Sequence, residues 1–133
     1  MHPRSFLFVP ATSDRKIDKA YASDADAVIV DLEDSVALSE KGNARTALDA
    51  ILNVKRSKAT WIRVNAMDTV HGYEDLLAIT RSGVNGIILP KVESAEQVRA
   101  VDWVMSNLER QRSLSHGAIE IMAIVETAKG LVH

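Results

Sequence analysis

Short apolar runs alternate with longer amphipathic stretches along the chain. Five apolar runs, several of them rich in β-branched residues, cover residues 6–9, 27–32, 60–65, 86–90 and 119–126. Continuous apolar runs of this length are typical of strands that are covered on both faces, as in a parallel sheet. The pattern therefore predicts five parallel strands.

Four helical segments separate these strands. They cover residues 13–22, 39–54, 71–82 and 94–110, and the last of them opens with the capping-box sequence SAEQ. Its apolar side chains recur about every 3.6 residues, as the buried face of a helix requires. The alternating order of strands and helices predicts right-handed βαβ units around one parallel sheet, which is an α/β fold.

The composition is that of a globular protein and excludes several classes. Of the 133 residues, 47% are apolar and 26% are charged, which argues against disorder. The net charge of −2 gives no electrostatic signal for nucleic acid, and the absence of cysteine excludes disulfides and thiolate chemistry. Because no apolar run reaches the ~20 residues of a membrane span and no segment resembles a signal peptide, we expect a cytoplasmic protein without a membrane partner.

Ionisable side chains gather at the carboxyl ends of the predicted strands. They are Asp31, Glu33 and Asp34 after the second strand, Arg63 in the third, Lys91 and Glu93 after the fourth, and Glu126 at the end of the fifth. In parallel sheets and barrels this edge carries the active site. We therefore place the candidate site there.

The types of these residues indicate the chemistry. Carboxylate oxygens suit Mg²⁺ or Mn²⁺ rather than zinc. Arg63 offers a planar fork that could hold a substrate carboxylate through two parallel hydrogen bonds, and Lys91 could pair with the acids or with an anionic substrate. A divalent ion that polarises a carbonyl group and stabilises an enolate fits chemistry on a 2-keto or 3-hydroxy acid. This set of residues predicts a lyase or aldolase site.

Several of these side chains have a second, purely structural interpretation. Asp31 and Asp34 could cap strand ends or pair with Lys91. A charge inside an apolar run costs free energy unless it has a partner, which favours a functional role for Arg63 and Glu126. The two tryptophans, Trp61 and Trp103, are expected to pack in the interior.

Five ordered segments resemble a known family. They are RSFLFVPA at residues 4–11, DLEDSV at 31–36, IRVN at 62–65, LPKVES at 89–94 and VETAKG at 125–130. These segments resemble the citrate lyase β-subunit family, which belongs to the broader HpcH/HpaI aldolase group with malyl-CoA and citramalyl-CoA lyases as relatives. The resemblance covers essentially the whole chain.

The resemblance implies a (β/α)8 TIM barrel of which this chain holds about the first five strands. Residues 1–133 are then expected to be the N-terminal part of a barrel lyase domain, truncated before strands six to eight. The second metal-ligand Asp of the family would follow about one βα unit after Glu126. A homo-oligomer is also implied, with a trimer as one arrangement.

The resemblance also implies roles for the acidic residues and for Arg63. Glu126 matches the first carboxylate ligand of Mg²⁺, and Arg63 matches the residue that holds the oxygens of the keto-acid part. Three residues match the acidic cluster that lines the metal site and are expected, with Arg63, to be catalytic: Asp31, Glu33 and Asp34.

Four further residues receive expected binding roles from the resemblance. Lys91 and Glu93 match a segment beside the metal site and are expected to bind substrate. Arg15 and Lys19 lie where the family often places basic residues near the phosphates of CoA. As charges of a first helix, the same two side chains also suit a solvated face.

The implied reaction is a Mg²⁺-dependent cleavage of a carbon–carbon bond, with Mn²⁺ as an alternative ion. A 3-hydroxyacyl-CoA or acyl-carrier thioester, such as citryl-CoA or malyl-CoA, would give an acetyl thioester and a 2-keto acid. Two alternatives stay open: a non-catalytic, truncated subunit that serves binding or assembly, and an aldolase that acts on free 4-hydroxy-2-keto acids.

Overall fold

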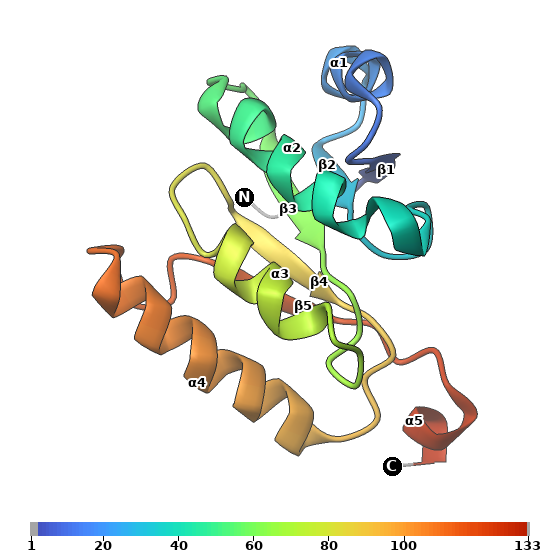
Figure 1. The fold of residues 1–133 in the computed structure, drawn as a ribbon, viewed down its shortest axis with the longest axis vertical. Coiled ribbons are helices and arrows are strands. Elements are labelled where there is room, and N and C mark those ends of the chain that lie inside the picture. Colours follow the sequence, from blue (N-terminus) through green and yellow to red (C-terminus); the bar gives the residue numbers. More distant parts are fainter. Residues whose placement is uncertain (1–2, 133) are drawn as a thin grey trace.

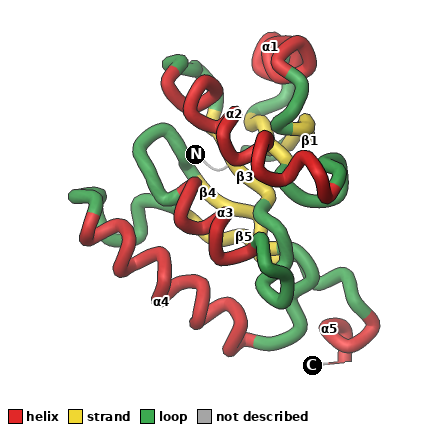
Figure 2. The backbone as a smooth tube through the Cα atoms, in the orientation of Figure 1, coloured by secondary structure: helices red, strands yellow, loops and turns green. Residues whose placement is uncertain are grey.

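Five parallel strands form one sheet in the computed structural model, which describes residues 3–132 (Figures 1 and 2). The strands are β1 (Phe6–Pro10), β2 (Ala27–Asp31), β3 (Ala59–Arg63), β4 (Gly86–Leu89) and β5 (Glu120–Ala123). They lie side by side in chain order, β1-β2-β3-β4-β5, and each neighbouring pair is parallel. The predicted α/β fold with five parallel strands is confirmed.

Helices connect the strands. They are α1 (Asp14–Ala22), the short 3-10 turn η1 (Leu38–Glu40), α2 (Lys41–Asn53), α3 (Gly72–Ile79), α4 (Ala95–Gln111) and α5 (Ala128–Val132). The four predicted helices are confirmed with small shifts at their ends. The sequence did not predict η1 or α5, because three and five residues are too few to show a periodic pattern.

The two faces of the sheet have different neighbours. Val28, Val30, Ile62 and Ile87 are fully buried on one face and belong to the same core cluster as the inward side chains of α1–α4. Figure 1 shows these four helices following one another along one side of the strands. Consecutive strand order with right-handed crossovers requires this one-sided arrangement, which is that of the βα units of a TIM barrel.

The opposite face carries a smaller apolar cluster centred on Trp61. This side chain is only 4% exposed, and Phe6 meets it edge-on with ring centroids 5.6 Å apart. Gly86 is the register partner of Trp61 on β4, and a Cβ atom there would lie 2.3 Å from the indole ring. Glycine is therefore required at this position for the tryptophan to lie flat across the sheet.

Two sequence expectations about apolar residues are corrected by the structure. Trp103 is 69% exposed on α4, because the inward face of that helix is occupied by Val101, Met105 and Leu108. The fifth strand is shorter than residues 119–126, because β4 ends at Leu89 and the next residue is a proline, which has no N–H to extend the ladder. Within residues 3–132, no helix combines the length and hydropathy needed to cross a membrane.

Candidate active site

The pairing of β2 with β3 places Asp31 directly beside Arg63. Arg63 donates from Nε to Asp31 Oδ1 and from Nη2 to Asp31 Oδ2, both at 2.7 Å. The ring of Phe8 lies 4.8 Å from the guanidinium carbon, which supports it from the β1 side. Arg63 therefore uses its planar fork to bind Asp31, whereas the sequence interpretation assigned that fork to a substrate carboxylate.

Asp31 also fixes the loop that follows β2. Its carboxylate accepts hydrogen bonds from the backbone N–H of Glu33 at 2.9 Å and of Ser35 at 3.0 Å, and from the Ser35 hydroxyl at 2.5 Å. Burial would raise the pKa of Asp31, but the hydrogen bonds from Arg63, Ser35 and Glu33 outweigh it and lower the pKa from 3.8 to about 2. Asp31 is therefore an anion that organises its neighbours.

Two more acids of this loop face two cations across the sheet edge. Arg63 Nη1 lies 3.5 Å from Glu33 Oε2 and 3.7 Å from Asp34 Oδ2. Lys91 Nζ forms an ion pair with Glu33 Oε1 and lies 3.6 Å from Asp34 Oδ1. The hydrogen bond to Glu33 raises the pKa of Lys91. The structure thus brings together five of the predicted residues, three acids and two bases.

Glu33 keeps one oxygen without a conventional hydrogen bond. Its side chain is buried, and within the described part of the chain Oε2 has no hydrogen-bond partner. Buried polar atoms of this kind are rare in folded proteins and often mark a position that a ligand or water completes.

Lys91 also connects this cluster to Glu126. Its backbone N–H donates to Glu126 Oε1 at 3.1 Å, and its φ of 52° is in the left-handed region that non-glycine residues rarely adopt. Such backbone strain is concentrated at functional sites, where the surrounding structure maintains it. Here the strained backbone lets one residue contact Glu33 with its side chain and Glu126 with its main chain.

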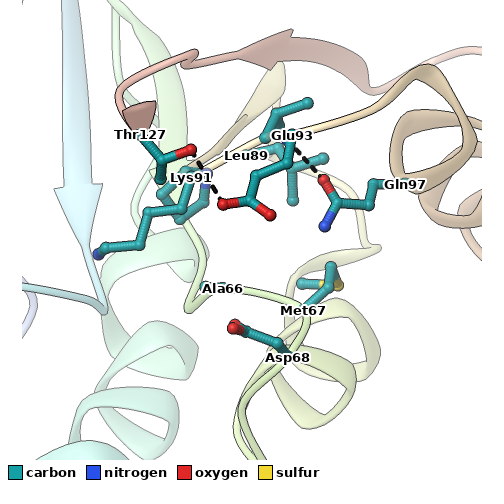
Figure 3. A pocket seen from close by; sticks show the side chains of 10 residues that line it. Ala66, Met67, Asp68, Leu89, Lys91, Glu93, Gln97 and Thr127 are labelled. Atoms are coloured by element: carbon teal, nitrogen blue, oxygen red, sulfur yellow. Dashed lines mark hydrogen bonds between the residues drawn. The ribbon is translucent and has the colours of Figure 1, made fainter. Parts of the chain in front are cut away.

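Glu93 lies apart from the acidic loop. Thr127 donates to Glu93 Oε1 at 3.0 Å, and Lys129 Nζ lies 2.8 Å from Oε2. Figure 3 shows Lys91 extending away from Glu93, which faces a small cavity opposite Asp68. This cavity has a volume of about 90 Å³ and lies between the loops that follow β3 and β4. Lys91 and Glu93 both line this cavity, but the Lys91 ammonium pairs with Glu33 and the Glu93 carboxylate pairs with Lys129.

Arg15 and Lys19 are exposed on α1. Arg15 lies in the first turn of the helix, next to the carboxyl end of β1, whereas Lys19 lies in its last turn. Only Arg15 is therefore at the same end of the sheet as the charged cluster. Contact with CoA phosphates stays a prediction for both residues.

The described residues offer a limited set of metal ligands. Among residues 3–132 there is no group of three or more His, Cys, Asp or Glu side chains that could hold a metal ion. Mg²⁺ is, however, commonly bound through one or two carboxylates, with substrate oxygens and waters as its other ligands. The exposed carboxylate of Glu126 beside Lys91 fits that partial role.

Sequence reasoning missed the residues behind the acidic loop. Lys41 is buried on α2, and Asp75 is fully buried on α3. In the sequence both look like the solvated charges of amphipathic helices, and only the docking of the helices shows that they are interior. Asp68, which lines the cavity opposite Glu93, was also missed.

Comparison with known proteins gives consistent matches along nearly the whole chain. The family described as HpcH/HpaI aldolase/citrate lyase matches residues 4–133. The citrate lyase subunit beta of Escherichia coli is 35% identical over 130 residues, covering 96% of this chain and 43% of that protein. The (3S)-malyl-CoA thioesterase of Cereibacter sphaeroides is 36% identical over 135 residues, covering 99% of this chain and 44% of that protein.

A solved structure is similar in fold as well as in sequence. CitE of Mycobacterium tuberculosis in complex with magnesium, acetoacetate and coenzyme A has a TM-score of 0.73 and 36% identity, covering 96% of this chain and 41% of that chain. The present chain thus spans less than half the length of each of these three proteins.

Proposed function

The chain belongs to the HpcH/HpaI aldolase/citrate lyase family, and from that premise we propose that its protein cleaves a carbon–carbon bond of a 3-hydroxyacyl thioester. The thioester is carried by CoA or by an acyl carrier, with malyl-CoA and citryl-CoA as candidates. The products are an acetyl thioester and a 2-keto acid. The magnesium, acetoacetate and coenzyme A bound by the similar CitE support this choice of ligands.

The observation that carries the proposal is the anchored arginine. Asp31 occupies Nε and Nη2 of Arg63, so the guanidinium is held in one orientation with Nη1 directed toward Glu33 and Asp34. A preorganised cation of this kind stabilises negative charge on a bound oxygen without reorganisation during the reaction. Arg63 Nη1 would bind an anionic oxygen of the keto-acid part.

The remaining residues of the cluster supply charge balance and position. Lys91 would add a second cation for the substrate carboxylates, since its ammonium already lies among the acids of the loop. Glu126 would hold Mg²⁺, or Mn²⁺, which when bound would stabilise negative charge on the 3-hydroxyl oxygen that becomes the keto oxygen of the product. Lys91 would orient Glu126 through its backbone N–H.

The test is a product analysis with the protein at its full natural length. Malyl-CoA and citryl-CoA are incubated with and without EDTA, and both products are quantified. We expect equal amounts of acetyl-CoA and of glyoxylate or oxaloacetate, formed only with the divalent ion. Turnover of free 4-hydroxy-2-keto acids at an equal rate would instead show an aldolase, and absence of any turnover would favour a binding or assembly subunit.

A second candidate reaction is hydrolysis of the thioester. It is favoured by the similarity to (3S)-malyl-CoA thioesterase, which is as great as the similarity to CitE. The two reactions give different products from malyl-CoA: hydrolysis releases free CoA and malate, whereas cleavage releases acetyl-CoA and glyoxylate. A thiol reagent together with a keto-acid assay separates them in one experiment.

A further inference from the structure

Two buried donors hold the acidic loop from behind. Lys41 Nζ donates to the carbonyl oxygens of Leu32 at 2.8 Å and of Glu33 at 2.6 Å. Asn65 Nδ2 donates to the same Leu32 oxygen at 2.9 Å. Both carbonyl groups are therefore bound by donors from α2 and from the loop after β3, while the side chains of Glu33 and Asp34 face Arg63.

Asp75 fixes the orientation of the Asn65 side chain. Its Oδ2 accepts from the Asn65 backbone N–H at 2.8 Å and from Asn65 Nδ2 at 2.6 Å. Its Oδ1 accepts from Arg45 Nη1 at 3.1 Å. Asn65 Nδ2 thus donates one proton to Asp75 and the other to Leu32, which leaves its amide group no freedom to rotate.

Because Asp75 is buried, its carboxylate depends on these hydrogen-bond partners. The side chain is 0% exposed on α3, and a carboxylate in that position costs free energy unless it is fully paired. Its partners come from two other parts of the fold, since Arg45 lies on α2 and Asn65 lies two residues after the end of β3. The carboxylate therefore joins two helices and a strand end to one loop.

We propose that Asp75 is a positioning residue of the active site. Through the Asn65 amide, and together with Lys41, it fixes the Leu32 carbonyl group and so sets the direction in which Glu33 and Asp34 face Arg63. The consequence for catalysis rests on the function proposed above. The consequence for the loop itself does not depend on that function.

A matched control is present at the opposite end of the sheet. Glu109 is 2% exposed on α4 and accepts hydrogen bonds from the backbone N–H groups of Gly117 at 2.8 Å and Ile119 at 3.1 Å. It is a buried carboxylate that holds a loop, as Asp75 is, but its loop leads to the amino end of β5. A purely structural effect of losing a buried carboxylate would be the same for both.

The test is hydrogen–deuterium exchange, read by mass spectrometry on the protein at its full natural length. The amides of Glu33 and Ser35 report on the loop, since both donate to Asp31. We expect Asp75→Ala to speed their exchange at least tenfold with little change elsewhere. Asp75→Asn, which keeps an acceptor for Asn65, should stay within about threefold of the wild type, and Glu109→Ala should leave this loop unchanged.

Unchanged exchange in the loop of Asp75→Ala, or an equal rise throughout the molecule, would overturn the proposal. Should Asp75→Ala not fold, Asn65→Ala tests the same link while the carboxylate remains, and unchanged loop exchange there has the same meaning. If the wild type cleaves thioesters, Asp75→Ala should lower kcat/KM by about tenfold or more and Asp75→Asn should restore most of it. A wild type without turnover would contradict the proposed function and leave the exchange result valid.

Discussion

The two ends of the parallel sheet use buried polar groups in different ways. At the amino ends, buried side chains bind main-chain groups or a neutral side chain: Asn85 Oδ1 accepts from the Thr60 N–H at 2.8 Å, and Tyr21 shares a 2.6 Å hydrogen bond with the Thr60 hydroxyl. At the carboxyl ends, charged groups face one another, as Arg63 and Lys91 face the acidic loop. The fold therefore uses buried polar groups at both ends, and it brings opposed charges together around the acidic loop at the carboxyl ends.

The pKa shifts of two buried groups, Tyr21 and Asp31, follow the same difference. Burial raises the pKa of Tyr21 at the amino ends, and the hydrogen bond to Thr60 offsets only part of that shift, so the neutral form is favoured. At the carboxyl ends the hydrogen bonds to Asp31 outweigh its burial and favour the anion. Charged forms are thus stabilised at the carboxyl ends, which is expected of a site that binds charged ligands.

The largest effect is expected from Arg63→Lys, which disrupts the charged cluster at the carboxyl ends of the strands. A lysine cannot form both bonds to Asp31, so the buried carboxylate loses part of its pairing, and we expect a loss of about 3 kcal/mol in the free energy of unfolding. Thioester cleavage should fall at least 100-fold. Urea unfolding and steady-state kinetics measure the two effects, and Arg99→Lys, on the exposed surface of α4, should change neither. Normal turnover of Arg63→Lys would show that the arginine anchored by Asp31 has no role in the reaction.

The second-largest effect is a loss of stability in acid, and it also involves Asp31 at the carboxyl ends of the strands. Because the pKa of Asp31 is about 2 in the folded protein and 3.8 ordinarily, its contribution is complete above pH 3.8 and disappears as the pH falls toward 2. The contribution is about 2 kcal/mol. Urea titrations between pH 6 and pH 2.5 should show this loss in the wild type, and Asp31→Asn should show a flatter curve. Parallel curves would contradict the assignment.

The sequence predicted the strands well because their apolar runs are continuous and their polar ends abrupt. It placed Asp31 and Arg63 at the same edge, but it could not show that Asp31 occupies the arginine fork, since this depends on the register between β2 and β3. The burial of Asp75 could not be predicted from the sequence, for a different reason. A charge in an amphipathic helix normally faces water, and burial follows only when α2 and α3 dock.

A smaller effect is expected from Gly86→Ala, at the start of β4 and away from the charged cluster. The new methyl group would meet the ring of Trp61 at 2.3 Å, and the tryptophan must move. We expect a loss of about 1.5 kcal/mol in the free energy of unfolding, with turnover little changed. Gly42→Ala is the matched control, because the new methyl group meets no atom within 4 Å and should stabilise α2 slightly. Equal free energies of unfolding for the two variants would show that the Trp61 side chain can move aside without loss of stability.

The smallest effect is expected from Arg4→Ala, at the amino ends. Asp26 Oδ2 accepts from the backbone N–H groups of Arg4 at 2.8 Å and Ser5 at 3.1 Å, and the Arg4 side chain adds only an exposed contact at 3.4 Å. Because alanine keeps the backbone donor, the midpoint of thermal unfolding and the turnover should both stay at wild-type values. A clear fall in either would mean that side-chain charge matters at this end too, and the contrast with Arg63 would then reflect burial alone.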